Sequence, residues 1–98
     1  MRTIKEINKE YGKFYVLLKN KEVGNKFLTA AENEGYTFGD GAKPTEKHFA
    51  NIMVVNNDMT INYAGTNGRI AFQCNATGTK RIDYSKVIAG DSNIFYEK

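Results

Sequence analysis

The stretch IMVVNNDMTINYAGTNGRIAFQC, residues 52–74, predicts β structure. Apolar and polar residues alternate along it, which is typical of strands with one buried face. Clusters of Asn, Asp and Gly interrupt the alternation, and the Asn67-Gly68 pair favours a hairpin turn. A further connection at residues 76–79 precedes the last strand. The sequence therefore predicts a β-meander with strands over residues 52–55, 60–64, 69–74 and 81–84.

The alternation sorts the side chains of this meander onto two faces. The apolar face is expected to lie on the helices and holds Ile61, Tyr63, Ile70, Phe72, Cys74, Ile82 and Tyr84. The polar face holds Thr60, Asn62, Arg69, Ala71, Gln73, Arg81 and Asp83. Because Cys74 alternates in phase with apolar neighbours, it is expected to be a buried, inert thiol. The polar face either is solvated or faces a ligand or partner.

The first half predicts a short helix followed by a strand–helix–strand unit. Thr3 and Glu6 form a capping-box pattern before a helix that Gly12 ends, and Asn20 caps a second helix that Gly35 stops. The expected elements are a helix over residues 4–11, a strand over 14–18, a helix from 21 to about 34 and a strand over 36–38 beside the first strand. The whole sequence predicts an α+β fold, with an antiparallel sheet of about five to six strands packed against two helices. In this fold a β-α-β start is followed by the β-meander.

Size and composition narrow the possible functions. The 98 residues fit a single domain, residues 1–98, and a core this thin is often supplemented by self-association. The net charge of +3 comes from interspersed residues without a polybasic tract, so no DNA partner is expected. No apolar run approaches the roughly 20 residues of a membrane span, and the N-terminus lacks the apolar core of a signal peptide. We therefore expect a cytoplasmic protein without a membrane partner.

One histidine, His48, and one cysteine, Cys74, leave little for catalysis or metal binding. They are too few for a structural zinc site, and no P-loop, EF-hand or HExxH motif is present. A serine triad would need Ser85 or Ser92 to meet His48, and neither serine has a nucleophile-elbow context. The expectation is a protein that is not an enzyme and needs no metal or cofactor.

Two segments combine features that suit an anionic ligand. The loop over residues 39–48 is long for a small domain and gathers cations, a hydroxyl and an imidazole beside two glycines. The turn over residues 65–68 is followed by an arginine at the start of a predicted strand, and a second arginine is expected on the neighbouring strand. A guanidinium group can bind a phosphate with two parallel hydrogen bonds. The candidate ligand-binding residues are Lys43, Thr45, His48, Thr66, Asn67, Arg69, Phe38 and Arg81. The alternatives are a solvated loop, and arginines paired with Asp58 or Asp83.

Two longer blocks resemble small proteins of phages that infect Gram-positive bacteria. They are FLTAAENEGYTFGDGAKPT at residues 27–45 and the segment from Ile52 to Gly90, which contains DMTINY at 58–63 and RIDY at 81–84. Together they cover most of the chain, and the functional family they resemble is the first-described anti-Thoeris sponges. The resemblance implies a phage protein in the cytoplasm of the infected bacterial host. Such a protein would suppress anti-phage defence.

The resemblance also implies a ligand and an assembly. The sponges bind cyclic ADP-ribose isomer signals such as glycocyclic ADP-ribose, and some take up cyclic oligonucleotides, without cleaving them. They assemble as dimers or hexamers with ligand sites between subunits. Two other interpretations stay open. One is a phage inhibitor that contacts a host defence protein directly, as anti-CRISPR proteins do, and the other is an enzyme that acts on a nucleotide.

Overall fold

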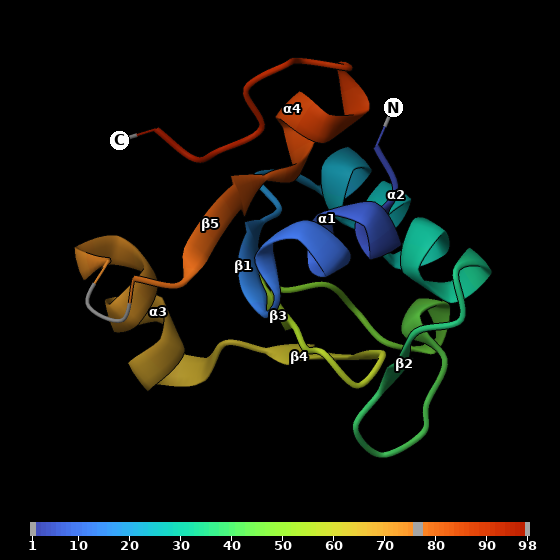
Figure 1. Ribbon diagram of the computed structural model, residues 1–98. Coiled ribbons are helices and arrows are strands. Elements are labelled where there is room, and N and C mark those ends of the chain that lie inside the picture. The colour runs from blue at the N-terminus through green and yellow to red at the C-terminus, as the bar shows by residue number, and fades with distance from the viewer. Residues whose placement is uncertain (1, 76–77, 98) are drawn as a thin grey trace.

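The computed structural model describes residues 2–75 and 78–97, and its fold is α+β as predicted (Figure 1). The helices are α1 (Ile4–Tyr11), α2 (Lys21–Asn33), the 3-10 helix η1 (Pro44–Glu46), α3 (Gly65–Cys74) and α4 (Tyr84–Ile88). The strands are β1 (Phe14–Leu17), β2 (Thr37–Phe38), β3 (Ile52–Val55), β4 (Thr60–Tyr63) and β5 (Lys80–Asp83). The connection predicted at residues 76–79 lies partly outside the described residues. Within those residues, no helix has both the length and the apolar character needed to cross a membrane.

The first two helices form where their capping signals predict. The Thr3 side chain accepts a hydrogen bond from the Glu6 backbone, and the Glu6 carboxylate accepts one from the Thr3 N–H, which completes the capping box. The carboxylate of Glu34, at the end of α2, accepts hydrogen bonds from the backbone N–H groups of Ile4 and Lys5 at 3.0 and 2.8 Å. The N-terminus of α1 is thereby fixed to the C-terminus of α2.

The described strands form one five-stranded sheet in the order β2-β4-β3-β1-β5. The β1–β3 and β3–β4 pairs are antiparallel, but β1–β5 and β2–β4 are parallel, so the sheet is mixed and not purely antiparallel. The expectation that β2 returns beside β1 is wrong, because Thr37 pairs with Thr60 and Phe38 with Ile61 of β4. The central position of β1, between β3 and β5, explains this: both of its edges are already occupied.

The segment predicted as a strand over residues 69–74 is instead part of the helix α3. Its alternation also fits a helix, because Ala64, Gly68, Ala71 and Phe72 recur at i, i+4, i+7 and i+8. In the helix Phe72 is buried, whereas Ile70 is 55% exposed. Cys74 is also exposed, so its expected burial as an inert thiol is wrong.

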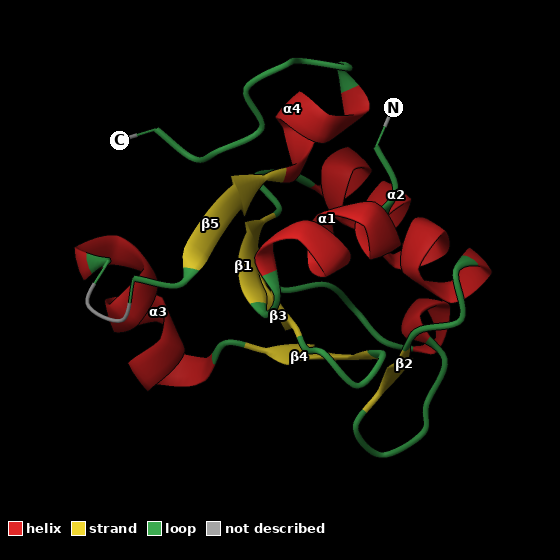
Figure 2. Ribbon diagram, viewed as in Figure 1, coloured by secondary structure: helices red, strands yellow, loops and turns green. Residues whose placement is uncertain are grey.

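Apolar side chains pack on both faces of the sheet. Figure 2 shows α1, α2 and α4 on one side and α3 on the other. The larger core, under α1, α2 and α4, includes Ile61, Ile82 and Tyr84, as predicted. The smaller core under α3 joins Phe72 to Tyr15, Ile52 and Val54. Tyr63 was expected in the core, but it is 40% exposed because β4 lies near the edge of the sheet.

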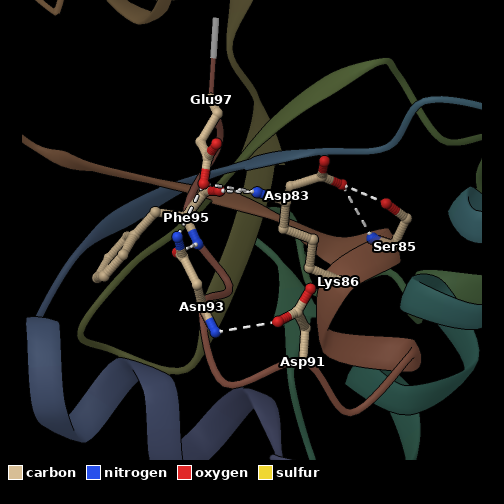
Figure 3. Close-up of polar contacts among 7 residues, drawn as sticks. All are labelled: Asp83, Ser85, Lys86, Asp91, Asn93, Phe95 and Glu97. Carbon is tan, nitrogen blue, oxygen red and sulfur yellow. Dashed lines mark hydrogen bonds and ion pairs between the residues drawn. The ribbon is translucent and has the colours of Figure 1, made fainter.

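The apolar tail at residues 94–96 packs against its own domain. The N–H of Asp83 donates to the carbonyl of Ile94, and the N–H of Tyr96 donates to that of Arg81, both at 2.9 Å. Figure 3 shows how polar side chains hold this tail to α4: the ammonium of Lys86 donates to the Phe95 carbonyl at 2.9 Å and lies 3.3 Å from the Glu97 carboxylate. The tail is therefore not an exposed apolar patch.

Candidate functional site

The outer face of α2 presents a row of polar side chains. The helix begins where the Asn20 side chain accepts a hydrogen bond from the Val23 N–H at 2.9 Å. Its buried face consists of Val23, Gly24, Phe27, Leu28 and Ala31. This stripe turns Lys21, Asn25 and Thr29 outward, at i, i+4 and i+8, so that they lie in line along the exposed side.

The segment around η1 crosses α2 and is anchored to it. The hydroxyl of Thr45 donates to the Glu32 carboxylate at 2.6 Å, and the Thr45 N–H donates to the same oxygen at 3.2 Å. These two hydrogen bonds hold the pKa of Glu32 below its usual value. The N–H of Lys43 donates to the Glu46 carboxylate at 2.8 Å, which closes the first turn of η1. The loop predicted as a ligand site is therefore held against α2 by hydrogen bonds.

Phe49 lies directly on the backbone of α2 at Gly24. A Cβ placed on Gly24 would lie 2.3 to 2.6 Å from three ring carbons of Phe49, closer than carbon atoms approach without bonding. Glycine is therefore required at this helical position so that the ring can approach. The contact between the Phe49 ring and Gly24 determines how closely the segment after η1 packs on α2.

We expect Gly24→Ala to lower the free energy of unfolding by about 1 to 3 kcal/mol through overpacking against the Phe49 ring. Alanine in a helix interior normally raises stability relative to glycine by about 1 kcal/mol, so the sign of the change is diagnostic. Gly39→Ala is the matched control, because a Cβ there meets no heavy atom of the described residues within 4 Å. Denaturant unfolding of both variants measures the difference. Stabilisation by Gly24→Ala would contradict the packing.

Between α2 and this segment lies a cavity of about 630 Å³, which we call the α2 groove. It is lined by Lys21, Asn25, Leu28, Thr29, Thr45, Lys47, His48 and Phe49. Two ammonium groups, an imidazole, two hydroxyls and an amide thus surround one cavity, with Leu28 and Phe49 as its apolar wall. Lys21 lies in the first turn of α2, where the helix dipole adds positive potential.

The charged groups of the α2 groove differ in how they are held. The Lys47 ammonium lies 2.7 Å from the Asp40 carboxylate and 4.6 Å from the centre of the Phe38 ring. The hydrogen bond from Lys47, together with one from the Ala42 N–H, holds the pKa of Asp40 below its usual value. Lys21 forms no ion pair within residues 2–75 and 78–97. One cation is thus fixed in place, and the other keeps its charge available.

His48 is positioned by its backbone. Its carbonyl accepts a hydrogen bond from the hydroxyl of Tyr63 at 2.5 Å, while its side chain is exposed at the rim of the α2 groove. Tyr63 in turn lies on β4, with its ring centre 5.4 Å from that of Phe38. The hydroxyl of Tyr63 thus links the segment after η1 to β4 of the sheet.

The structure divides the eight predicted site residues between two ends of the sheet. Thr45 and His48 line the α2 groove. Phe38 is buried beneath Lys47, and Lys43 is exposed outside the lining of the groove. The other four predicted residues are remote from this group. Thr66, Asn67 and Arg69 lie on α3, and Arg81 lies on β5, the edge strand opposite β2.

The two arginines do not form a joint phosphate grip on neighbouring strands, because α3 is a helix. Arg81 donates a hydrogen bond to the Phe72 carbonyl at 2.8 Å, and its guanidinium lies 5.4 Å from the centre of the Tyr96 ring. It thereby joins the end of α3 to the tail. Arg69 is exposed.

The expected alternative pairing with Asp58 or Asp83 is also wrong for both arginines. Asp83 accepts hydrogen bonds from the N–H and hydroxyl of Ser85, at 3.1 and 2.6 Å, and so caps α4 (Figure 3). Asp58 accepts hydrogen bonds from Thr60 in the β3–β4 turn. Each carboxylate therefore stabilises a local turn.

The residues of the α2 groove that were not predicted come mainly from α2. Lys21, Asn25 and Thr29 carry a signal in the sequence, because they share one helical face of an element that the sequence does predict. The same pattern is typical of any solvated helix face. Only the approach of Phe49 and the segment around η1 turns that face into a groove.

No group of three His, Cys, Asp or Glu side chains in the described part of the chain is placed to hold a metal ion. Comparisons with models of known protein families, with curated proteins and with solved structures found no match to this chain. Function therefore has to be inferred from the chemistry of the α2 groove.

Proposed function

We propose that this protein binds a small nucleotide-type anion in the α2 groove and holds it without chemical change. The observation that carries the proposal is the gathering of Lys21, Lys47 and His48 around one cavity of about 630 Å³. Lysine ammonium groups and a helix N-terminus attract phosphate, and imidazole and hydroxyl groups hydrogen-bond its oxygens. Leu28 and Phe49 form an apolar wall that carbon atoms of such a ligand can contact.

The resemblance to the anti-Thoeris sponges supports a sharper form of the proposal. In that form the ligand is a cyclic ADP-ribose-type signal such as glycocyclic ADP-ribose, or a cyclic oligonucleotide. A phage would use the protein in the cytoplasm of its bacterial host to remove the signal and suppress defence. Lys21, which forms no ion pair within the described residues, offers its positive charge to a pyrophosphate ligand.

Self-association, as a dimer or hexamer, belongs to the same proposal. The resemblance supports it, and so does the exposed apolar side chain of Ile70, which is 55% exposed on α3. The native mass of the purified protein decides between a monomer and an oligomer. A change from oligomer to monomer on Ile70→Lys would place α3 in the subunit contact.

The same exposed surface favours a second candidate function, direct inhibition of a host defence protein. Ile70 is 55% exposed on α3, and Arg69 is its neighbour in the sequence. An arginine beside an exposed apolar side chain is typical of protein interfaces. This candidate predicts that α3, and not the α2 groove, is needed for the effect on defence.

Calorimetry with glycocyclic ADP-ribose and with ADP-ribose tests the first candidate. We expect saturable binding that Lys21→Ala weakens about tenfold, in keeping with about 1.5 to 3 kcal/mol for a hydrogen bond to a charged group. The substitution removes a cation from the first turn of α2, where the helix dipole disfavours it, so the fold is not weakened. Lys13→Ala, at the other end of β1, makes the same change of charge and should leave the affinity unaltered.

The fate of the ligand separates a binding protein from an enzyme. After binding, the protein is denatured by heat and the released ligand is analysed by mass spectrometry. Recovery of the intact molecule supports sequestration, whereas a changed mass would overturn that part of the proposal. No heat of binding with either nucleotide would overturn the assignment of the α2 groove.

A further inference from the structure

A second cavity lies on the other side of the exposed face of α2, against α4. It has a volume of about 570 Å³, and we call it the α2–α4 groove. It is lined by Asn25, Lys26, Thr29, Ala30, Asn33, Tyr84 and Ile88. Its volume, like that of the α2 groove, falls in the range of small-molecule sites.

The two grooves share a wall. Asn25 and Thr29 line both, and they lie one helical turn apart, so together they form the boundary between the two cavities, which we call the ridge. A ligand that crosses this ridge would contact both cavities at once. The arrangement follows from packing: the segment around η1 covers one flank of α2, and α4 covers the other.

The two grooves differ in chemistry. The α2 groove gathers Lys21, Lys47 and His48, whereas the α2–α4 groove has an apolar floor in which the Tyr84 ring packs edge-on against Phe27, with ring centres 5.3 Å apart. Ala30 and Ile88 complete this floor. One cavity therefore suits phosphates and the other suits a planar ring.

Polar groups at the rim of the α2–α4 groove remain available. The side-chain amides of Asn25 and Asn33 take part in no hydrogen bond within the part of the chain that the structure describes. A side-chain amide offers a donor and an acceptor together, which is the pattern that reads the edge of an adenine. The hydroxyl of Tyr84, which forms no hydrogen bond within the described residues, adds a donor.

We propose that the two grooves form one two-part site in which the α2–α4 groove holds the purine base of a nucleotide whose phosphates lie in the α2 groove. The sugar crosses the ridge of Asn25 and Thr29. The base rests on Ala30, Ile88 and the Tyr84 ring, and the amides contact its edge. This inference rests on the proposed function and adds to it the class of base and the place where it binds.

Calorimetry with two probes separates this inference from the proposed function. Inorganic pyrophosphate reports on the α2 groove alone, and ADP-ribose reports on both grooves. ADP-ribose should bind the unaltered protein at least tenfold more tightly than pyrophosphate. Lys21→Ala should weaken the binding of both probes, which tests the proposed function itself.

Two variants test the α2–α4 groove. Ala30→Leu fills it, and Asn33→Ala removes an exposed amide without changing the packing of the core. Each should weaken ADP-ribose binding about tenfold and leave pyrophosphate binding within twofold. Asn67→Ala, an exposed asparagine of α3, is the matched control and should change neither. Thermal unfolding checks that each variant is folded, and if Ala30→Leu is not, Asn33→Ala decides alone.

The outcomes are distinct. If pyrophosphate binds and Lys21→Ala weakens it, but neither variant alters ADP-ribose binding, the proposed function stands and the two-part site is overturned. If ADP-ribose binds no more tightly than pyrophosphate, the two-part site is again overturned. If neither probe binds, the proposed function fails and this inference fails with it.

Discussion

Replacing Phe72 with alanine is expected to lower the free energy of unfolding by about 3 to 5 kcal/mol, the usual cost of removing a buried aromatic ring. The ring of Phe72 is 2% exposed and packs edge-on against Tyr15 and, at 4.8 Å between ring centres, beside Tyr96. It is also the side chain of α3 that enters the second core. Its loss would leave α3, a helix with glycine at two of its ten positions, without its main support.

Ile70→Ala is the matched control for Phe72→Ala. The Ile70 side chain is 55% exposed in the single chain, so we expect its truncation to change the stability of the monomer by no more than about 0.5 kcal/mol. Guanidinium unfolding followed by circular dichroism measures both variants. A strand at residues 69–74 would bury Ile70 and Phe72 on the same face and make both substitutions costly. Comparable losses in the two variants would therefore contradict α3.

Stability is expected to fall steeply between pH 10 and pH 12. Burial, with the nearby Glu34, raises the pKa values of Tyr36 and Tyr84 from 10.0 to about 12 in the folded protein. Above pH 10 the unfolded chain loses these protons while the folded chain keeps them, so the stabilisation is complete below pH 10 and is lost as the pH rises toward 12. At about 1.4 kcal/mol per pKa unit, each tyrosine contributes a loss of at most about 2 to 3 kcal/mol, reduced by the screening of nearby solvent.

Tyr84→Phe tests this alkaline dependence most cleanly, because the Tyr84 hydroxyl takes part in no hydrogen bond among the described residues. We expect the variant to lose about half of the stability that the unaltered protein loses over this pH range. Tyr36→Phe should reduce the loss similarly, but from a lower starting stability, because the Tyr36 hydroxyl donates to the side-chain amide oxygen of the buried Asn8 at 2.9 Å. Urea unfolding at a series of pH values measures the slopes. An unchanged slope in Tyr84→Phe would contradict the raised pKa of Tyr84.

Local signals predicted the parts of the fold that depend on nearby residues. The caps at Thr3 and Asn20 placed α1 and α2, and the alternation in residues 52–63 placed β3 and β4. The periodicity did not identify α3, because Phe72 belongs both to an alternating pattern with Ile70 and Cys74 and to a helical pattern with Ala64 and Ala71. In the structure Phe72 packs on Tyr15 from a helix. The sequence also did not predict which strand pairs with β2, because the pairing of β2 with β4 joins residues that are distant in sequence.

The candidate site was predictable in one half only. The glycines and the proline of a long connection pointed to the region of Thr45 and His48, and both residues line the α2 groove. The outward row of α2 has the composition of a solvated face, and it lines a groove only because Phe49 and the segment around η1 pack on the helix. Arg69 and Arg81 were assigned together because α3 was predicted as a strand beside the last one, and that assignment is lost with the strand.

The most direct test of the α2 groove as the ligand site is a nuclear magnetic resonance titration of isotope-labelled protein with ADP-ribose. If the α2 groove binds the nucleotide, we expect the amide signals of Lys21, Asn25, Thr29 and His48 to shift in a saturable manner, while those of α3 do not shift. Shifts concentrated at residues 66–69 and at Arg81, or no shifts at saturating nucleotide, would contradict it.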